Sequence, residues 1–149
     1  MSSSIVLTPI GVVHSAVDQP LDCAWSGIKA RIELDASRFK PASLAGLGDF
    51  SQVEVVFAFH RVAESDIRYA ARHPRARTDW PAGGIFAQRG KDGPNCIAAT
   101  VCRLMSAQGL GLDVEGLDAI EGTPVLDNKP CRSEFGPREE TRQPAGATE

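Results

Sequence analysis

Two short segments of this chain contain most of the residues that could do chemistry. The first runs from Gly84 to Thr100 and reads GIFAQRGKDGPNCIAAT, and the second runs from Gly116 to Pro130 and reads GLDAIEGTPVLDNKP. Each begins like a strand and then places Gly, Pro, Asn and charged side chains close together. Glycine and proline fix unusual backbone angles, and glycine lets the backbone approach a ligand. We therefore expect the two segments to form two walls of one pocket.

The charged residues of these walls have both a binding and a structural interpretation. Arg89, Asp118 and Glu121 could hold a ligand that carries positive and negative groups. However, an exposed arginine often forms a surface ion pair, and an aspartate often caps a turn through its own side chain. His60, at the end of the run VEVVFAF, could be a hydrogen-bonded structural histidine. The residue types alone leave both interpretations open.

The aromatic residues near these walls favour a structural interpretation. Large aromatic side chains mostly contribute buried area to a core. We expect Phe57, Phe59 and Phe86 to pack in the core rather than to serve as stacking platforms.

The cysteines and histidines do not form a metal-binding pattern. The four cysteines include no C-x-x-C pair, and the three histidines do not repeat at ligand spacing. We expect no zinc site and free thiols in a reducing cytoplasm.

The charge distribution is uneven along the chain. The net charge of −3 argues against a general nucleic-acid coat protein, which would be basic overall. Between Arg61 and Arg77, however, five arginines face only Glu64 and Asp66. Such a patch could bind phosphate groups, or it could be a solvated arginine-rich loop.

The hydrophobic pattern predicts a mainly β fold. Alternating apolar and charged residues from 28 to 35 indicate a half-buried antiparallel strand, and VEVVFAF indicates a buried one. Further strands are expected over residues 5–13, 85–88, 97–105, 111–115 and 125–128, and short helical turns over 37–45 and 63–72. About seven short strands without a βαβ rhythm or G-x-G-x-x-G predict a single-domain antiparallel β-barrel and disfavour a Rossmann fold.

We expect neither a transmembrane helix nor a signal peptide. No apolar run reaches transmembrane length, and the first residues lack a basic segment typical of a signal peptide. We expect a cytoplasmic protein with one domain over residues 1–131. Residues 132–149 are polar and are expected to form a flexible tail.

Five segments, in order, resemble the TrmO family, which is also called TsaA-like or YaeB-like. PIGVVHS, from Pro9, resembles the family's opening strand P-I-G-x-[IV]-x-S. LGDFSQ, from Leu47, and FAFH, from Phe57, resemble L-x-x-[FL]-S-[HQ] and F-x-F-H. GIFAQR, from Gly84, resembles G-[VI]-F-A-T-R. The segment from Gly116 resembles G-x-D-x-x-[DE]-G-T-P-[VL]-[LVI]-D-I-K-P, the longest and most specific pattern.

The resemblance implies a small β-barrel methyltransferase that uses S-adenosylmethionine to methylate N6 of threonylcarbamoyl-adenosine beside the tRNA anticodon. It also implies a homodimer with the cofactor near the subunit interface. The cofactor-binding positions that it implies are Cys23, Ala24, Trp25, His60, Arg61, Phe86, Arg89, Ala99, Asp118, Ala119, Ile120 and Glu121. It implies no metal, and no catalytic residue can be assigned; Glu121 and Asp127 are candidate bases only as carboxylates in the right segment.

One loop departs from the family pattern. Where the family reads R-S-P-x-R-P-N-P-I-G-[LM]-[ST], this chain has Gly93 for the second arginine, Cys96 for the second proline and Ala98 for the glycine. The lost arginine is a bidentate donor suited to phosphate or carboxylate, and Lys91 could replace it only as a point charge. The departure therefore keeps two alternatives open: a cofactor-binding protein without tRNA methylase activity, serving as a sensor or interaction module, and a small-molecule methyltransferase.

Overall fold

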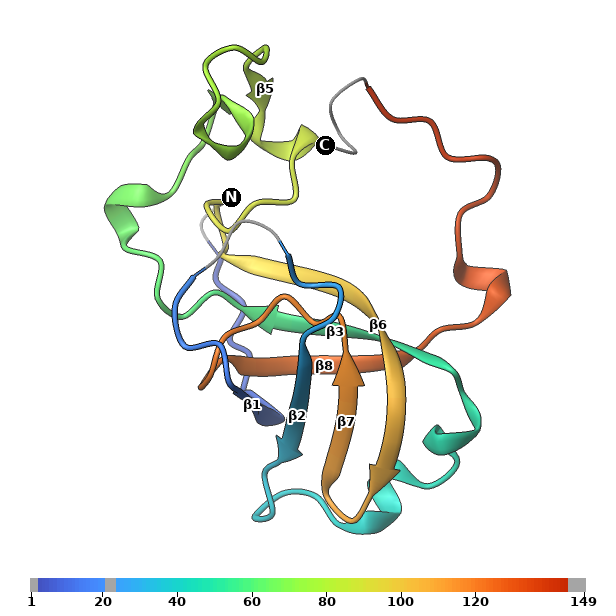
Figure 1. The fold of residues 1–149 in the computed structure, drawn as a ribbon. Helices are drawn as coiled ribbons and strands as arrows, with labels where there is room; N and C mark the ends of the chain where they lie inside the picture. The colour runs from blue at the N-terminus through green and yellow to red at the C-terminus, as the bar shows by residue number, and fades with distance from the viewer. Residues whose placement is uncertain (1–2, 21–23, 145–149) are drawn as a thin grey trace.

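Six antiparallel strands close into a barrel in the order β1-β2-β7-β6-β3-β8 (Figure 1). The structure is a computed structural model that describes residues 3–20 and 24–144. The barrel strands are β1 (Gly11–Ser15), β2 (Lys29–Leu34), β3 (Gln52–Ala58), β6 (Ile97–Gln108), β7 (Gly111–Glu115) and β8 (Pro124–Pro130). Every pair of neighbours in the barrel is antiparallel, so the mainly β, single-barrel prediction is confirmed.

The barrel follows from strands whose side chains alternate between core and solvent. In β2, Ala30, Ile32 and Leu34 are buried while the charged residues between them are exposed. In β3, Val53, Val55 and Phe57 are fully buried. Because successive side chains on a strand point to opposite faces, this alternation determines which face each strand turns inward.

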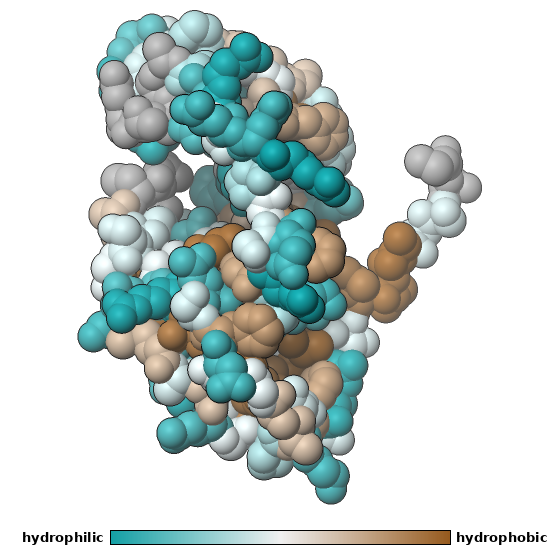
Figure 2. Space-filling model, turned by 90° about the vertical axis from the view of Figure 1, so that its right-hand side faces the viewer, coloured by the Kyte–Doolittle hydropathy of each residue, from teal (hydrophilic) through white to brown (hydrophobic). Residues whose placement is uncertain are grey.

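One expected strand was wrong in part and another was wrong entirely. The strand expected over 5–13 begins only at Gly11, because Gly11 is opposite Leu34, the last residue of β2. The preceding residues extend past that end, and Ile5 and Val6 are almost fully exposed, at 88% and 89%. Figure 2 shows an apolar segment that projects from the body of the protein. The strand expected over 85–88 is instead a 3-10 turn, η5 (Ile85–Ala87).

A lobe rises from one end of the barrel and consists of residues 60–95 (Figure 1). The N–H of Phe59 donates to the carbonyl of Cys96 over 2.8 Å, so the chain enters and leaves the lobe through one neck. The lobe contains a two-stranded sheet, β4 (Ala71–Arg72) with β5 (Gly83–Gly84), the turn η5 and the turns η3 (Glu64–Asp66) and η4 (Pro74–Ala76).

An ion pair and an amide hold the lobe together. Arg72 donates to the carboxylate of Asp92 over 2.5 Å, and Asp92 is only 6% exposed. The Gln88 side chain accepts from Arg72 and donates to the carbonyls of Arg72 and Gly83. A Cβ on Gly90 would lie 2.4 Å from Arg72 Nη2, so a larger residue here would displace the Arg72 guanidinium. These polar contacts therefore hold the lobe together alongside the buried Ile85.

Short turns complete the described structure. The turns η1 (Pro41–Leu44) and η2 (Leu47–Asp49) lie between β2 and β3, where a short helix was expected over 37–45. After β8, one more turn, η6 (Ser133–Phe135), lies in the segment expected to be a tail. In the described part of the chain, no helix is long and apolar enough to cross a membrane.

Candidate functional site

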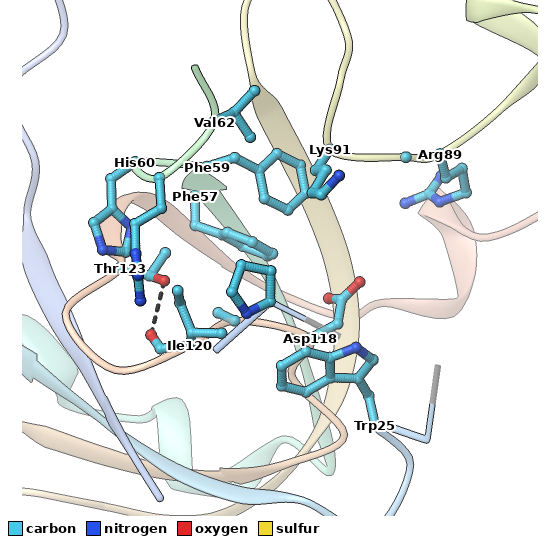
Figure 3. A pocket seen from close by; sticks show the side chains of 14 residues that line it. Trp25, Phe57, Phe59, His60, Val62, Arg89, Lys91, Asp118, Ile120 and Thr123 are labelled. Carbon is cyan, nitrogen blue, oxygen red and sulfur yellow. Dashed lines mark hydrogen bonds between the residues drawn. The ribbon is translucent and has the colours of Figure 1, made fainter. Parts of the chain in front are cut away.

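A pocket of about 140 Å³ lies between the lobe and the end of the barrel from which the lobe rises (Figure 3). Its walls come from four parts of the chain: residues between β1 and β2, the end of β3 with the residues that follow it, the lobe loop 89–91, and the segment 118–123 that precedes β8. The residues that line it are Pro20, Trp25, Phe57, Phe59, His60, Arg61, Val62, Arg89, Gly90, Lys91, Asp118, Ala119, Ile120 and Thr123. The pocket therefore joins the two segments that the sequence placed as walls of one site.

Two phenylalanines form the apolar floor. The rings of Phe57 and Phe59 meet edge to face, with centroids 5.4 Å apart and planes at 74°. Phe57 is fully buried, whereas Phe59 is partly exposed. Such a floor suits a planar apolar group, because ring edges and faces pack against one another favourably.

The residues after β3 form a basic side of the pocket. His60 and Arg61 follow the last paired residues of this strand, where the sequence placed them. Arg61 Nη1 donates to the carbonyl of Asp18 over 2.6 Å, which ties this side to the chain after β1. The backbone bond from Phe59 to Cys96 keeps the whole turn against β6.

The segment before β8 forms the acidic side. Asp118 accepts a hydrogen bond of 2.5 Å from the hydroxyl of Thr100 on β6, which orients the carboxylate. Trp25 lines the same part of the pocket (Figure 3). Ala119 and Ile120 are buried, and Thr123 Oγ1 donates to the Ile120 carbonyl over 2.8 Å. This internal bond fixes the turn that presents Asp118.

The lobe supplies two cations. Arg89 donates to the carbonyl of Ala99, so its guanidinium lies across the neck of the lobe. Lys91 lines the pocket while its Nζ lies 3.2 Å from Asp92. Lys91 therefore brings a positive charge to the pocket wall in a loop that lacks the arginine of the family pattern.

Four of the sequence-predicted residues line no part of the described pocket, and one lies outside the described residues. Ala24 is exposed with a φ of 71°, and Phe86 is 88% exposed on the lobe surface rather than in the core. Ala99 contributes the carbonyl that accepts from Arg89 but does not line the pocket. Cys23 lies outside the described residues, and the fourth residue is Glu121.

Glu121 faces away from the pocket and toward β1. Its carboxylate accepts from the Ser15 N–H over 2.6 Å and lies 3.1 Å from His14 Nδ1. The Ser15 N–H and then the His14 ring stabilise the charged form and lower the pKa of the Glu121 carboxyl below its ordinary value. The other candidate base, Asp127, pairs with Lys129 on the barrel wall. Neither carboxylate is thus placed to take a proton in this pocket.

Sequence reasoning missed the contribution of several lining residues. Phe57 and Phe59 were expected only in the core, and Lys91 only as a substitute charge; Pro20, Val62, Gly90 and Thr123 were not assigned to the site. The F-x-F alternation was an available signal. The buried Phe57 and the partly buried Phe59 both contact the space that the lobe covers.

The altered loop takes a course that the family pattern could not take unchanged. Cys96 has a φ of 51°, whereas proline is locked near −65°, so the proline of the pattern does not fit this backbone. Ala98 pairs with Phe57 as an ordinary strand residue and needs none of glycine's freedom. Gly93 leaves open space where a side chain could stand.

The thiols and the metal-ligating side chains do not form a reactive centre in the described residues. Cys96, Cys102 and Cys131 are free, and burial raises the pKa of the Cys102 thiol to about 12, which keeps it protonated and inert. Within residues 3–20 and 24–144, no cluster of three or more His, Cys, Asp or Glu could hold a metal ion.

Comparison with known protein families shows which family this chain belongs to. The family profile described as "tRNA-methyltransferase O N-terminal domain" matches residues 13–136 of this chain. The chain belongs to the TrmO family. The match includes both segments from which the site was first inferred and every residue that lines the pocket.

Individual TrmO relatives agree with this assignment. A mouse tRNA (adenine(37)-N6)-methyltransferase is 30% identical over 90% of this chain, and a putative S-adenosylmethionine-dependent methyltransferase of Pseudomonas aeruginosa is 39% identical over 83%. A probable S-adenosyl-L-methionine-binding protein of Pyrococcus abyssi is 31% identical over 93% of this chain and 74% of its own length. The chain spans only 32% of the mouse protein and 55% of the Pseudomonas one.

Crystal structures of TrmO have the same fold. One from Pseudomonas aeruginosa covers 94% of this chain and 62% of its own, with a TM-score of 0.74 and 25% identity. Another TrmO crystal structure reaches a TM-score of 0.74 at 27% identity and covers 95% of this chain and 64% of its own. The barrel with its lobe is therefore a TrmO fold.

Proposed function

We propose that this chain binds S-adenosylmethionine in the pocket between barrel and lobe and transfers its methyl group to N6 of an adenosine in tRNA. The observation that carries the proposal is that the family match spans residues 13–136, which include all the lining residues. The names of relatives support both parts, since they include S-adenosyl-L-methionine-binding proteins and tRNA (adenine(37)-N6)-methyltransferases. Threonylcarbamoyl-adenosine beside the anticodon is the acceptor that we favour.

The residues of the pocket fit this cofactor. The Phe57 and Phe59 rings offer an apolar surface for adenine. The Asp118 carboxylate can stabilise a sulfonium or an ammonium, and Lys91, Arg61 or Arg89 can pair with a carboxylate. When bound, the cofactor would supply an electrophilic methyl group for transfer to the acceptor nitrogen. The chain contributes by positioning this group in line with the acceptor.

The lobe supports the choice of RNA as the acceptor. Residues 60–95 carry seven basic and four acidic side chains, although the whole chain has a net charge of −3. Tyr69 and Phe86 are 73% and 88% exposed on this lobe, where aromatic rings could stack on unpaired bases. Basic side chains with exposed aromatics suit a single-stranded loop better than a small neutral acceptor.

A homodimer is part of the proposal, and exposed apolar side chains on β6 support it. Ile97, Val101 and Met105 are 46%, 54% and 44% exposed and share the outer side of this strand with Arg103. Sedimentation equilibrium tests this part: a wild-type dimer that becomes a monomer on Val101→Glu supports it, and a wild-type monomer contradicts it.

Nucleoside analysis of tRNA tests the activity. Purified protein incubated with S-adenosylmethionine and tRNA containing threonylcarbamoyl-adenosine should yield the N6-methylated nucleoside, and tRNA from a deletion strain should lack it. Cofactor binding without any methylated nucleoside would instead favour the second candidate, a cofactor-binding sensor or interaction module. The observation that favours this second candidate is the left-handed backbone conformation of Cys96 in the altered loop.

A further inference from the structure

Three ionic side chains meet in the lobe beside the pocket. The carboxylate of Asp92 lies between two cations, with its Oδ2 2.5 Å from Arg72 Nη1 and its Oδ1 3.2 Å from Lys91 Nζ. The side chain of Asp92 is 9% exposed, whereas that of Lys91 is 37% exposed. Two positive charges therefore share one buried negative charge, and the three side chains together carry one net positive charge.

Arg72 is held inside the lobe and neutralises Asp92 there. Its Nε donates to the Gln88 side chain over 2.9 Å, and its Nη2 lies against Gly90. Arg72 lies behind the pocket rather than in its lining. Because solvent screens a largely buried ion pair only weakly, Arg72 compensates most of the Asp92 charge.

The charge of Lys91 is left for the pocket. Its ammonium has three N–H donors, of which one is directed at Asp92, and its side chain lines the pocket from the lobe (Figure 3). The flexible stem of lysine lets the ammonium turn from one acceptor to another. Arg61 and Arg89 also line the pocket, but each guanidinium donates to a backbone carbonyl of another segment. Lys91 is therefore the pocket cation with the most freedom to turn toward an anionic ligand.

We propose that Lys91 binds the carboxylate of an amino-acid group in this pocket, through a charge-assisted hydrogen bond. The family pattern has proline at this position, so the lysine distinguishes this chain from the pattern. The proposal rests on the proposed function, because both ligands named there carry such a group. One is the methionine end of S-adenosylmethionine, and the other is the threonine end of threonylcarbamoyl-adenosine.

Binding measurements with and without a carboxylate test the cofactor as its source. Calorimetry compares S-adenosylhomocysteine with 5′-methylthioadenosine, which has the adenosine and the sulfur but lacks the amino-acid end. Lys91→Met removes the charge and nearly keeps the length of the side chain. If the cofactor carboxylate is the partner, this variant should bind S-adenosylhomocysteine about three- to tenfold more weakly and methylthioadenosine as tightly as wild type does.

Fluorescence anisotropy tests the acceptor as the source. With S-adenosylhomocysteine at saturation, an anticodon stem-loop RNA that contains threonylcarbamoyl-adenosine is compared with the same RNA that contains adenosine. If the threonine carboxylate is the partner, Lys91→Met should weaken binding of the modified RNA by a similar factor and leave the unmodified RNA unchanged. Lys91→Arg keeps the positive charge and should restore the wild-type affinities in both experiments.

Lys129→Met is the matched control, because Lys129 pairs with Asp127 on the barrel wall, and it should change none of these affinities. The proposal is overturned if Lys91→Met keeps all wild-type affinities, or if it weakens the ligands without a carboxylate equally. Lys91→Gln gives the same comparison if the methionine variant does not fold. A wild-type chain that binds none of these ligands would overturn the proposed function as well, so the two failures are distinguishable.

Discussion

The hydroxyl of Thr100 on β6 donates a hydrogen bond of 2.5 Å to the carboxylate of Asp118, which lies just before β8. This bond links the two segments that the sequence marked as walls of one pocket. Asp118 is also the only carboxylate that lines the pocket among the residues that the structure describes. A cationic ligand in this pocket therefore depends on Asp118 for its neutralisation.

Replacing Asp118 with asparagine should weaken binding of S-adenosylmethionine by about 5- to 30-fold, since a charge-assisted contact contributes about 1 to 2 kcal/mol more than a neutral one. The loss should be smaller for S-adenosylhomocysteine if the carboxylate pairs with the sulfonium. Calorimetry measures both affinities. Asp113→Asn is the control, because Asp113 pairs with Arg31 outside the pocket. Equal losses for the two ligands would mean that Asp118 does not recognise the sulfonium.

Glu121 should affect stability rather than cofactor affinity. Its pKa is held below the ordinary value of 4.5, so its contribution to stability is present above that value and is lost as the pH falls through the lowered pKa. Glu121→Gln should therefore lower the thermal midpoint at pH 7, and the difference from wild type should shrink below pH 4.5. A pH-independent difference, or a large loss of affinity for the cofactor, would contradict this assignment.

The left-handed residue of the altered loop can be tested by two substitutions. Cys96→Gly should stabilise the protein by about 1 kcal/mol, because glycine adopts a positive φ without steric cost. Cys96→Pro should destabilise it by about 3 kcal/mol or more, because proline cannot adopt this angle. Urea unfolding gives both values. A tolerated proline would mean that the loop follows the course of the family pattern.

The exposed aromatics of the lobe should bind RNA by stacking. Tyr69→Ala and Phe86→Ala should each weaken tRNA binding about tenfold, within the range of about 1 to 3 kcal/mol per stacked base. Filter binding or fluorescence anisotropy measures this effect. Phe135→Ala is the matched control, since Phe135 is 84% exposed but lies after β8 rather than on the lobe. Equal effects of all three changes would argue against recognition by the lobe.

Oδ1 of Asn128 is buried without a hydrogen-bond partner among the described residues, and removing it should stabilise the protein. Asn128→Leu replaces a buried polar group with an apolar one of similar size, and the expected gain is about 1 to 3 kcal/mol. Urea unfolding of the ligand-free chain gives the value. An unchanged or lower stability would indicate that the amide already has its partners.

The barrel could be predicted from the sequence because the pattern of apolar and polar residues within each strand shows which side chains are buried. The alternation in β2 and the Val-rich run of β3 follow from which side chains can be buried, and β7 (Gly111–Glu115) has the expected bounds. The strand predicted over residues 5–13 was too long, because an apolar run does not show whether a neighbouring strand is long enough to pair with it. β1 begins only where Leu34 can pair with Gly11.

The site was only partly predictable, because its geometry depends on contacts between distant segments. Residue types placed Arg89 and Asp118 in the right walls, but they could not show that Glu121 turns toward His14 and Ser15. The sequence also could not show that the Phe86 side chain points to solvent. It depends on a 3-10 turn whose Ile85 N–H donates to the Ala70 carbonyl across the lobe.

The most direct test of the central claim is a titration of the wild-type chain with S-adenosylmethionine, followed by backbone amide NMR. The account predicts saturable binding to one site per chain, with the largest shifts at Trp25, His60, Lys91 and Asp118. Residues 43–47 and 128, at the other end of the barrel, should remain unshifted. No shifts at millimolar cofactor, or shifts centred away from the pocket, would contradict it.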